Sequence, residues 1–180
     1  MFYLLYYFLL YKLFYLSYKL YYFDISELKN IVDNKKNKIV FAVYGHTSFL
    51  DIIIPLKCFF ILSNIKAIAH NKYKMFYPDF LKKYFYFTRK NMSTMILDTH
   101  LALFIDGTRY KKDRLRTGYI YISKNNNADI CYLCIDFDKN KICCSKIIKN
   151  DKIDELYNNK IILEPLKELI KYKNISYYPK

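Results

Sequence analysis

Short apolar runs alternate with longer amphipathic stretches along most of the chain. Apolar runs bounded by turn residues are typical of buried strands, and longer periodic stretches are typical of helices. The pattern predicts strands at 38–44, 65–70, 84–89, 101–106, 129–137 and 141–148. It predicts helices at 47–62, 72–83, 91–99, 114–124, 151–158 and 163–173. This alternation predicts an α/β fold, with a mostly parallel mixed sheet flanked by helices.

The first 23 residues follow another pattern: they contain eight tyrosines, and phenylalanine and leucine fill most of the remaining positions. No basic stretch precedes the apolar run and no small-residue cleavage site follows it, as a secretory signal would require. Lys12 and Lys19 interrupt the run and, being seven apart, share one face of a helix. Because tyrosine favours the headgroup level of a bilayer, we expect residues 1–30 to be a membrane-associated helical segment. A helix docked on a soluble domain is the alternative.

A charged linker at 33–38 separates this segment from the first strand, so residues 38–180 are expected to form one α/β domain. The linker leads into the apolar run 39–44, and Gly45 follows that run and permits a sharp turn. His46 and Asp51 come next, four residues apart. A carboxylate on one imidazole nitrogen leaves the other free to take a proton, so His46 is a candidate general base oriented by Asp51. A histidine that helps to cap a helix is the alternative reading.

A second polar group follows the apolar run 101–105: Asp106, Gly107, Thr108 and Arg109 are consecutive. Glycine allows close approach of the backbone to a ligand, and arginine presents a planar fork suited to phosphate oxygens. An exposed strand-to-loop turn would have the same sequence. Two polar groups of this kind at strand ends favour a binding site.

These two blocks resemble the glycerolipid acyltransferases, in particular the lysophosphatidic acid acyltransferase group, over about residues 38–137. The first block of that family, His-x4-Asp, matches His46 and Asp51, and its third block matches 104–109. Between them the family has a lysine, a proline and a strand that ends in arginine. Their counterparts in this sequence are Lys72, Pro78 and Arg89.

The chain departs from the family pattern at three positions after the first block. Asp106 replaces the usual glutamate, Ile105 replaces a proline, and the strand at 130–135 lacks the proline of the fourth block. The basic residue and glycine that open a helix after the third block match Arg116 and Gly118.

The resemblance implies transfer of a fatty acyl group from acyl-CoA or acyl-carrier protein to a lysophospholipid or glycerol-phosphate hydroxyl. His46 would be the general base and Asp51 its orienting partner. The substrate-binding residues implied by the resemblance are Lys72, Arg89, Asp106, Gly107, Thr108 and Arg109. It implies no metal and no cofactor beyond the acyl donor, and a phospholipid membrane as partner.

Charge leaves a second class of function open. The net charge is +14, and only four of the 30 basic residues are arginine. Such a charge attracts a protein to phospholipid or to nucleic acid, so a non-catalytic basic protein binding either surface is an alternative. The abundance of Lys, Asn, Ile and Tyr also matches an AT-rich coding genome. Because the tyrosines concentrate at one end, we expect no nucleic-acid partner. An acyltransferase that has lost turnover is a further alternative.

The five cysteines indicate a reducing, intracellular compartment, and we expect the protein to be membrane-associated there. Cys131-x-x-Cys134 followed by Cys143-Cys144 resembles a zinc pattern. However, each pair lies in an apolar strand, whose side chains alternate between the two faces of the sheet. We therefore expect the two cysteines of a pair to point to opposite faces and to be buried as small hydrophobic side chains. His70 and His100 are expected to be structural or rim residues, with His70 nearer a cleft.

Overall fold

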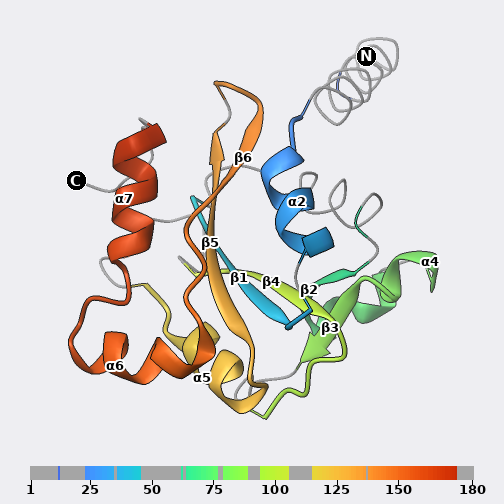
Figure 1. Ribbon diagram of the computed structural model, residues 1–180. Helices are drawn as coiled ribbons and strands as arrows, with labels where there is room; N and C mark the ends of the chain where they lie inside the picture. The colour runs from blue at the N-terminus through green and yellow to red at the C-terminus, as the bar shows by residue number, and fades with distance from the viewer. Residues whose placement is uncertain are drawn as a thin grey trace.

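The computed structural model describes residues 23–34, 36–45, 62, 64–76, 79–88, 94–105, 115–136 and 138–173, together with residue 12. In these residues six strands form one sheet in the order β3-β2-β4-β1-β5-β6 (Figure 1). The strands are β1 (Ile39–Tyr44), β2 (Ile65–His70), β3 (Phe85–Thr88), β4 (His100–Phe104), β5 (Asp129–Asp136) and β6 (Lys141–Cys144). Neighbouring strands are parallel except β5 and β6, which are antiparallel. The predicted α/β class, with a mostly parallel mixed sheet, is therefore confirmed.

Helices cover both faces of this sheet (Figure 1). On one face lies α2 (Ser26–Asn34), whose Leu28 and Val32 are buried against the strands. On the other face lie α5 (Gly118–Asn125), α6 (Ile153–Asn158) and α7 (Glu164–Lys173). The shorter elements are η1 (Asn71–Phe76), α4 (Asp79–Lys82) and η2 (Asn150–Lys152). The result is a three-layer arrangement.

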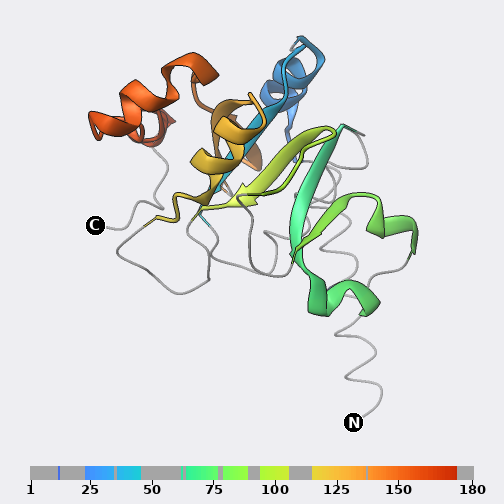
Figure 2. The same cartoon turned by 90° about the horizontal axis from the view of Figure 1, so that it is seen from below.

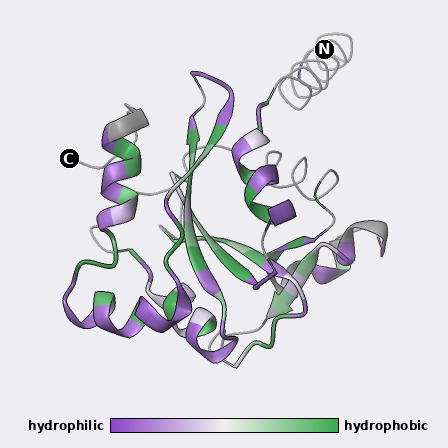
Figure 3. Ribbon diagram, viewed as in Figure 1, coloured by the Kyte–Doolittle hydropathy of each residue, from purple (hydrophilic) through white to green (hydrophobic). Residues whose placement is uncertain are grey.

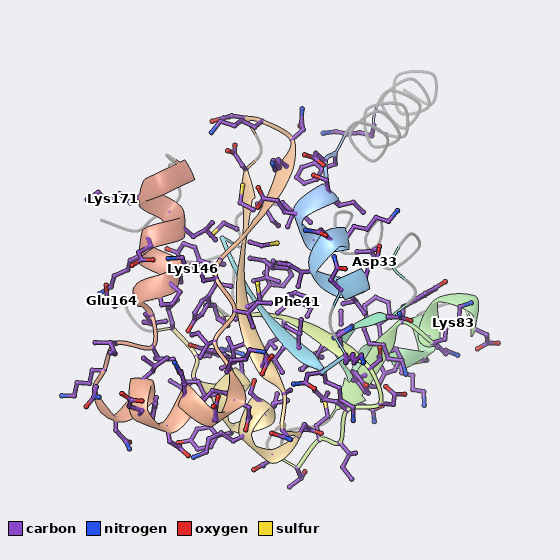
Figure 4. The ribbon with its side chains drawn as sticks, viewed as in Figure 1. Asp33, Phe41, Lys83, Lys146, Glu164 and Lys171 are labelled. Atoms are coloured by element: carbon purple, nitrogen blue, oxygen red, sulfur yellow. The ribbon has the colours of Figure 1, made fainter. Side chains whose placement is uncertain are left out.

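Strands β1 and β5 form the centre, and every residue in both is buried. Parallel strands covered on both faces are apolar at successive positions, which explains why β1 reads Ile-Val-Phe-Ala-Val-Tyr. Phe41 faces the α2 layer, and Figure 4 shows it in the interior of the molecule. Its neighbours Val40 and Ala42 face the layer of α5 and α7. Each fully buried large apolar side chain contributes roughly 1.5–3 kcal/mol.

The strand predictions at 38–44, 65–70, 84–89, 101–106 and 129–137 are confirmed to within two residues. The prediction of one strand over 141–148 is wrong in its second half, because β6 ends at Cys144. There the Ser145 hydroxyl oxygen accepts the Tyr132 N–H at 3.0 Å, which interrupts the ladder, and Ile148 pairs with Ile130 as an isolated bridge.

The helices predicted at 151–158 and 163–173 are confirmed as α6, preceded by η2, and as α7. The helix predicted at 114–124 begins later, at Gly118. The helix predicted at 47–62 lies outside the described residues, except for Leu62, which is buried.

Two predicted helices are wrong. In place of one helix over 72–83 the chain forms η1 and α4, because Pro78 between them lacks an N–H and disfavours helical geometry in the preceding residue. The described part of 91–99, residues 94–99, contains no helix. There the side chain of Asn126 satisfies backbone groups that a helix would use: it accepts the Leu97 N–H at 2.7 Å and donates to the Met95 carbonyl at 2.8 Å.

Residues 23–34 pack on the sheet. Phe23 is 3% exposed and belongs to the same apolar cluster as Leu28 and Phe41. Asp24 adds main-chain hydrogen bonds to the outer side of β6, through Asn140 at 2.7 Å and Ile142 at 2.9 Å. Within the described residues, the helices are too short or too polar to cross a bilayer.

Candidate functional site

Four neighbouring parallel strands end at one level across the sheet. The register pairs Val43 of β1 with Phe104 of β4, and His70 of β2 with Thr88 of β3. Ala67 of β2 pairs with Ala102 of β4, which brings the ends of all four strands into one row. Because strands lie about 4.8 Å apart, the ends of β1 and β4 are neighbours and β3 ends roughly 14 Å from β1.

Gly45 ends β1 with a backbone conformation that other residues rarely adopt. Its φ is +99°, it is buried, and a Cβ built on it would meet no atom within 4 Å. The need for glycine is therefore conformational rather than steric. The positive φ fits the glycine that the sequence places directly after the first strand.

Main-chain hydrogen bonds hold the residue that follows β4. The Ile105 N–H donates to the Val43 carbonyl at 3.0 Å, which extends the β1–β4 pairing by one residue. The Ile105 carbonyl in turn accepts the Arg116 N–H at 2.7 Å. Ile105 and Arg116, which flank the segment 106–115, are thus direct neighbours. The sequence contained no signal for this contact, because main-chain groups make it.

Helix α5 begins just after this segment, at Gly118, so a glycine does open the helix as expected. The preceding Thr117 makes no side-chain capping hydrogen bond. Backbone N–H groups in the first turn of a helix carry partial positive charge. The start of α5 therefore adds a weakly electropositive element beside the end of β4.

The described parts of the connections that follow β1 and β4 pack on opposite faces of the sheet. The connection from β1 to β2 contributes Leu62 to the cluster on the α2 face. The connection from β4 to β5 contains α5, whose Tyr119 and Ile122 pack on the other face. Open α/β sheets bind ligands at the carboxyl ends of neighbouring strands whose connections lie on opposite faces. The carboxyl ends of β1 and β4 are therefore the candidate position for a site.

Most predicted site residues lie outside the described residues: His46, Asp51, Arg89, Asp106, Gly107, Thr108 and Arg109. Lys72 lies in η1, which begins directly after β2. The described residues that precede these segments, Gly45, His70, Thr88 and Ile105, end a strand or directly follow one, in the same row. The structure thus brings together the described residues that precede each predicted block.

His100 lies at the opposite edge of the sheet, where β4 begins. Its Nδ1 accepts the Ile39 N–H at 3.0 Å, and its ring lies 6.0 Å from that of Phe41. Burial lowers the pKa of the imidazole. His100 is therefore structural, as predicted. His70 is the last residue of β2 and lies in the row of strand ends.

The four cysteines of the zinc-like pattern do not face one another as a set. Cys134 and Cys143 lie in the cluster on the α5 face, whereas Cys131 lies on the α2 face with Cys144 packed against it. This confirms the prediction that alternation separates the members of each pair.

The arrangement defines a doubly wound α/β domain, with helices on both faces of a mostly parallel sheet. Comparison of the chain with protein-family models, with curated proteins and with solved structures finds no match.

Proposed function

We propose that this protein is an O-acyltransferase that moves a fatty acyl group from acyl-CoA or acyl-carrier protein to a glycerolipid. The acceptor is the hydroxyl of a lysophospholipid or a glycerol phosphate. The observation that carries the proposal is the parallel pairing of β1 and β4, which makes their carboxyl ends neighbours. The His-x4-Asp block follows one of these strands and the Asp-Gly-Thr-Arg block follows the other.

In this mechanism His46 removes the proton of the acceptor hydroxyl as its oxygen attacks the thioester carbonyl carbon. The carbon–sulfur bond then breaks, and the imidazolium returns the proton to the thiolate, which leaves as a free thiol. Asp51 holds the imidazole in the required tautomer and stabilises its charged form. A general base of this kind contributes roughly 100- to 10,000-fold to the rate.

Arg109 binds the acceptor phosphate through its planar fork, assisted by the Gly107–Thr108 turn. Asp106 is the fourth proposed substrate-binding residue of this block. Lys72 and Arg89 add positive charge, since each follows a strand that ends in the same row as β1 and β4. The first turn of α5 adds a further partial charge next to this segment.

The test is an assay of the full-length protein with labelled acyl-CoA and a panel of lysophospholipids and glycerol 3-phosphate, followed by identification of the product. His46→Ala should lower turnover by roughly 100- to 10,000-fold. The matched control is His100→Asn, which removes a histidine at the opposite edge of the sheet and should retain turnover. Activity of His46→Ala within a few-fold of the parent would contradict the mechanism. Absence of transfer by the folded parent would favour a non-catalytic surface-binding protein or a degenerate acyltransferase.

We also propose that the aromatic N-terminal segment lies in the membrane interface. Phe23 is buried in the domain, so we propose residues 1–22 as this segment. Lys12, the residue of this segment that the structure describes, is helical and exposed. Tyrosine-rich helices of this kind keep their rings at the headgroup level, close to a lipid substrate.

A further inference from the structure

One surface at the outer side of the sheet combines lysine, methionine and aromatic side chains. We define the η1–β3 surface by Lys74, Met75, Lys83, Tyr84 and Phe87. Met75 is 80% exposed, and both lysines are exposed. Tyr84 and Phe87 are half-buried. Met75 thus adds an exposed apolar side chain directly after Lys74 in η1.

The two lysines lie over aromatic rings. The Lys74 Nζ is 5.8 Å from the ring centre of Phe87, and the Lys83 Nζ is 4.9 Å from that of Tyr84. Long lysine side chains in this position cover the rings with their apolar stems and leave the ammonium groups in water. Figure 4 shows Lys83 projecting at the outer side of the molecule, far from Phe41. Figure 3 shows β3 as a hydrophobic strand at this side of the sheet.

The surface carries an excess of positive charge. Asp79 is the carboxylate of α4, and it is engaged by Lys82 at 2.5 Å. Among the described residues neither Lys74 nor Lys83 forms an ion pair. Their charge is therefore available to an anionic partner.

The part of the surface formed by η1 and Phe87 adjoins the edge where the proposed active site lies, whereas Lys83 and Tyr84 precede the start of β3. Element η1 follows β2 without a break, as Figure 2 shows, and Phe87 pairs in register with Ala69, one residue before the end of β2. A partner on this surface would lie next to the row of strand ends.

We propose that the η1–β3 surface contacts an anionic phospholipid membrane, with Met75 entering the headgroup region and Lys74 and Lys83 meeting lipid phosphates. This inference rests on the proposed function, because the contact would hold the proposed active site against the bilayer that contains the acceptor lipid. Each lysine near an anionic leaflet strengthens binding roughly fivefold.

The absence of tryptophan from the sequence provides a direct test. Met75→Trp in the full chain introduces a single reporter, studied with phosphatidylcholine–phosphatidylglycerol vesicles whose acyl chains are brominated. We expect a blue-shifted emission and quenching by the brominated lipid. The matched control is Ile96→Trp, at a position 85% exposed. It precedes β4, at the edge of the sheet opposite to Met75, where Asn126 holds the neighbouring Leu97, and should not be quenched. Absence of binding, absence of quenching at position 75, or equal quenching at both positions would overturn the proposal.

A charge-reversal pair tests the lysines separately. The double change Lys74→Glu and Lys83→Glu should lower partition onto the same vesicles by at least about tenfold. The control pair, Lys146→Glu and Lys152→Glu, also changes exposed lysines that form no ion pair among the described residues, and it should change partition by less than about threefold. Equal effects of the two pairs would overturn the proposal. So would self-association of the first pair with unchanged vesicle binding, because the lysines would then protect an outermost strand from pairing.

Failure of the proposed function would be visible separately. Acyl transfer to glycerol 3-phosphate, a water-soluble acceptor, reports on the catalytic residues, and quenching at position 75 reports on the surface. Quenching without transfer to any acceptor would support the membrane contact and contradict the acyltransferase. Transfer without quenching would support the acyltransferase and contradict the membrane contact of the η1–β3 surface.

Discussion

At the residue scale, the structure places His70 and His100 at opposite edges of the sheet. His100 is a buried acceptor that ties the start of β4 to the start of β1. His70 ends β2, and Gly45, which precedes His46 in the sequence, follows β1. His70 and Gly45 lie at the edge formed by the carboxyl ends of the parallel strands.

The buried position of His100 predicts how stability depends on pH. Burial lowers the pKa of this imidazole in the folded state, so the unfolded chain takes up a proton first as the pH falls. The stability that neutral His100 contributes is present above about pH 6.5, the ordinary value, and is lost as the pH decreases towards the lowered folded-state pKa. Protonation of Nδ1 would also remove the acceptor of the Ile39 N–H. Urea unfolding between pH 7.5 and 5 should show a steeper loss for the parent than for His100→Asn. Identical slopes would mean that another group is responsible.

Two substitutions should separate the roles of the proposed site residues. Asp51→Asn should lower turnover with little effect on acceptor affinity, because it disturbs the orientation of the imidazole. Arg109→Lys should chiefly raise the acceptor KM, since lysine cannot form the bidentate contact with phosphate. Steady-state kinetics with varied acceptor would show the difference, with Arg114→Lys as the control within the same segment. If Arg109→Lys lowered only turnover, the phosphate-binding role would be wrong.

At the scale of elements, α2 is joined to β6 by polar contacts as well as by its buried face. Glu27 of α2 accepts the Cys144 N–H at 3.0 Å and pairs with Lys141 at 3.0 Å. These contacts close the outer side of β6, where Asp24 also pairs. A short helix therefore caps a strand that would otherwise present unpaired backbone groups.

Loss of the Glu27 carboxylate should weaken this junction. Glu27→Ala leaves the Cys144 N–H without its acceptor, and we expect a loss of about 1–3 kcal/mol in the free energy of unfolding. Asp33→Ala is the control, because Asp33 is an exposed carboxylate on the same helix. Chemical denaturation of the two variants would measure the difference. Equal stability of both variants would show that apolar packing alone holds α2.

At the scale of the whole molecule, the proposal places two basic and aromatic parts against one bilayer. The N-terminal segment supplies eight tyrosines, and the η1–β3 surface supplies lysines beside an exposed methionine. Two weak contacts on one molecule strengthen binding more than either does alone, because the second contact forms intramolecularly.

The contribution of the N-terminal segment is testable by charge reversal. Lys12→Glu with Lys19→Glu should lower binding to anionic vesicles, since each lysine is worth about 1 kcal/mol at such a surface, and should preserve secondary structure. Vesicle flotation and circular dichroism on this variant and on a deletion of residues 1–22 would distinguish the two readings of the segment. A docking helix would give unaltered flotation for the double change and an unfolded or aggregated deletion variant.

The sequence by itself determined the parts of this protein that depend on neighbouring residues. The apolar runs located the parallel strands, as the match at 65–70 illustrates. Gly45 indicated a backbone conformation that only glycine adopts readily, and its φ is +99°. Local pattern failed where a distant group replaced local bonding: Asn126 holds 95–97 in a non-helical conformation, and Ser145 ends the ladder of β6.

The tertiary structure alone decided which strands are neighbours. The periodicity of apolar residues indicates which residues are buried, but it does not indicate which strands pair. It could not predict that β4 lies between β1 and β2, because β4 begins about 60 residues after β1 in the sequence. That insertion makes β1 and β4 adjacent, so that their carboxyl ends are neighbours. The residues of the two polar blocks were readable from the sequence. The strands that precede these blocks end at one edge because they pair in parallel, and strand pairing is decided only in the folded chain.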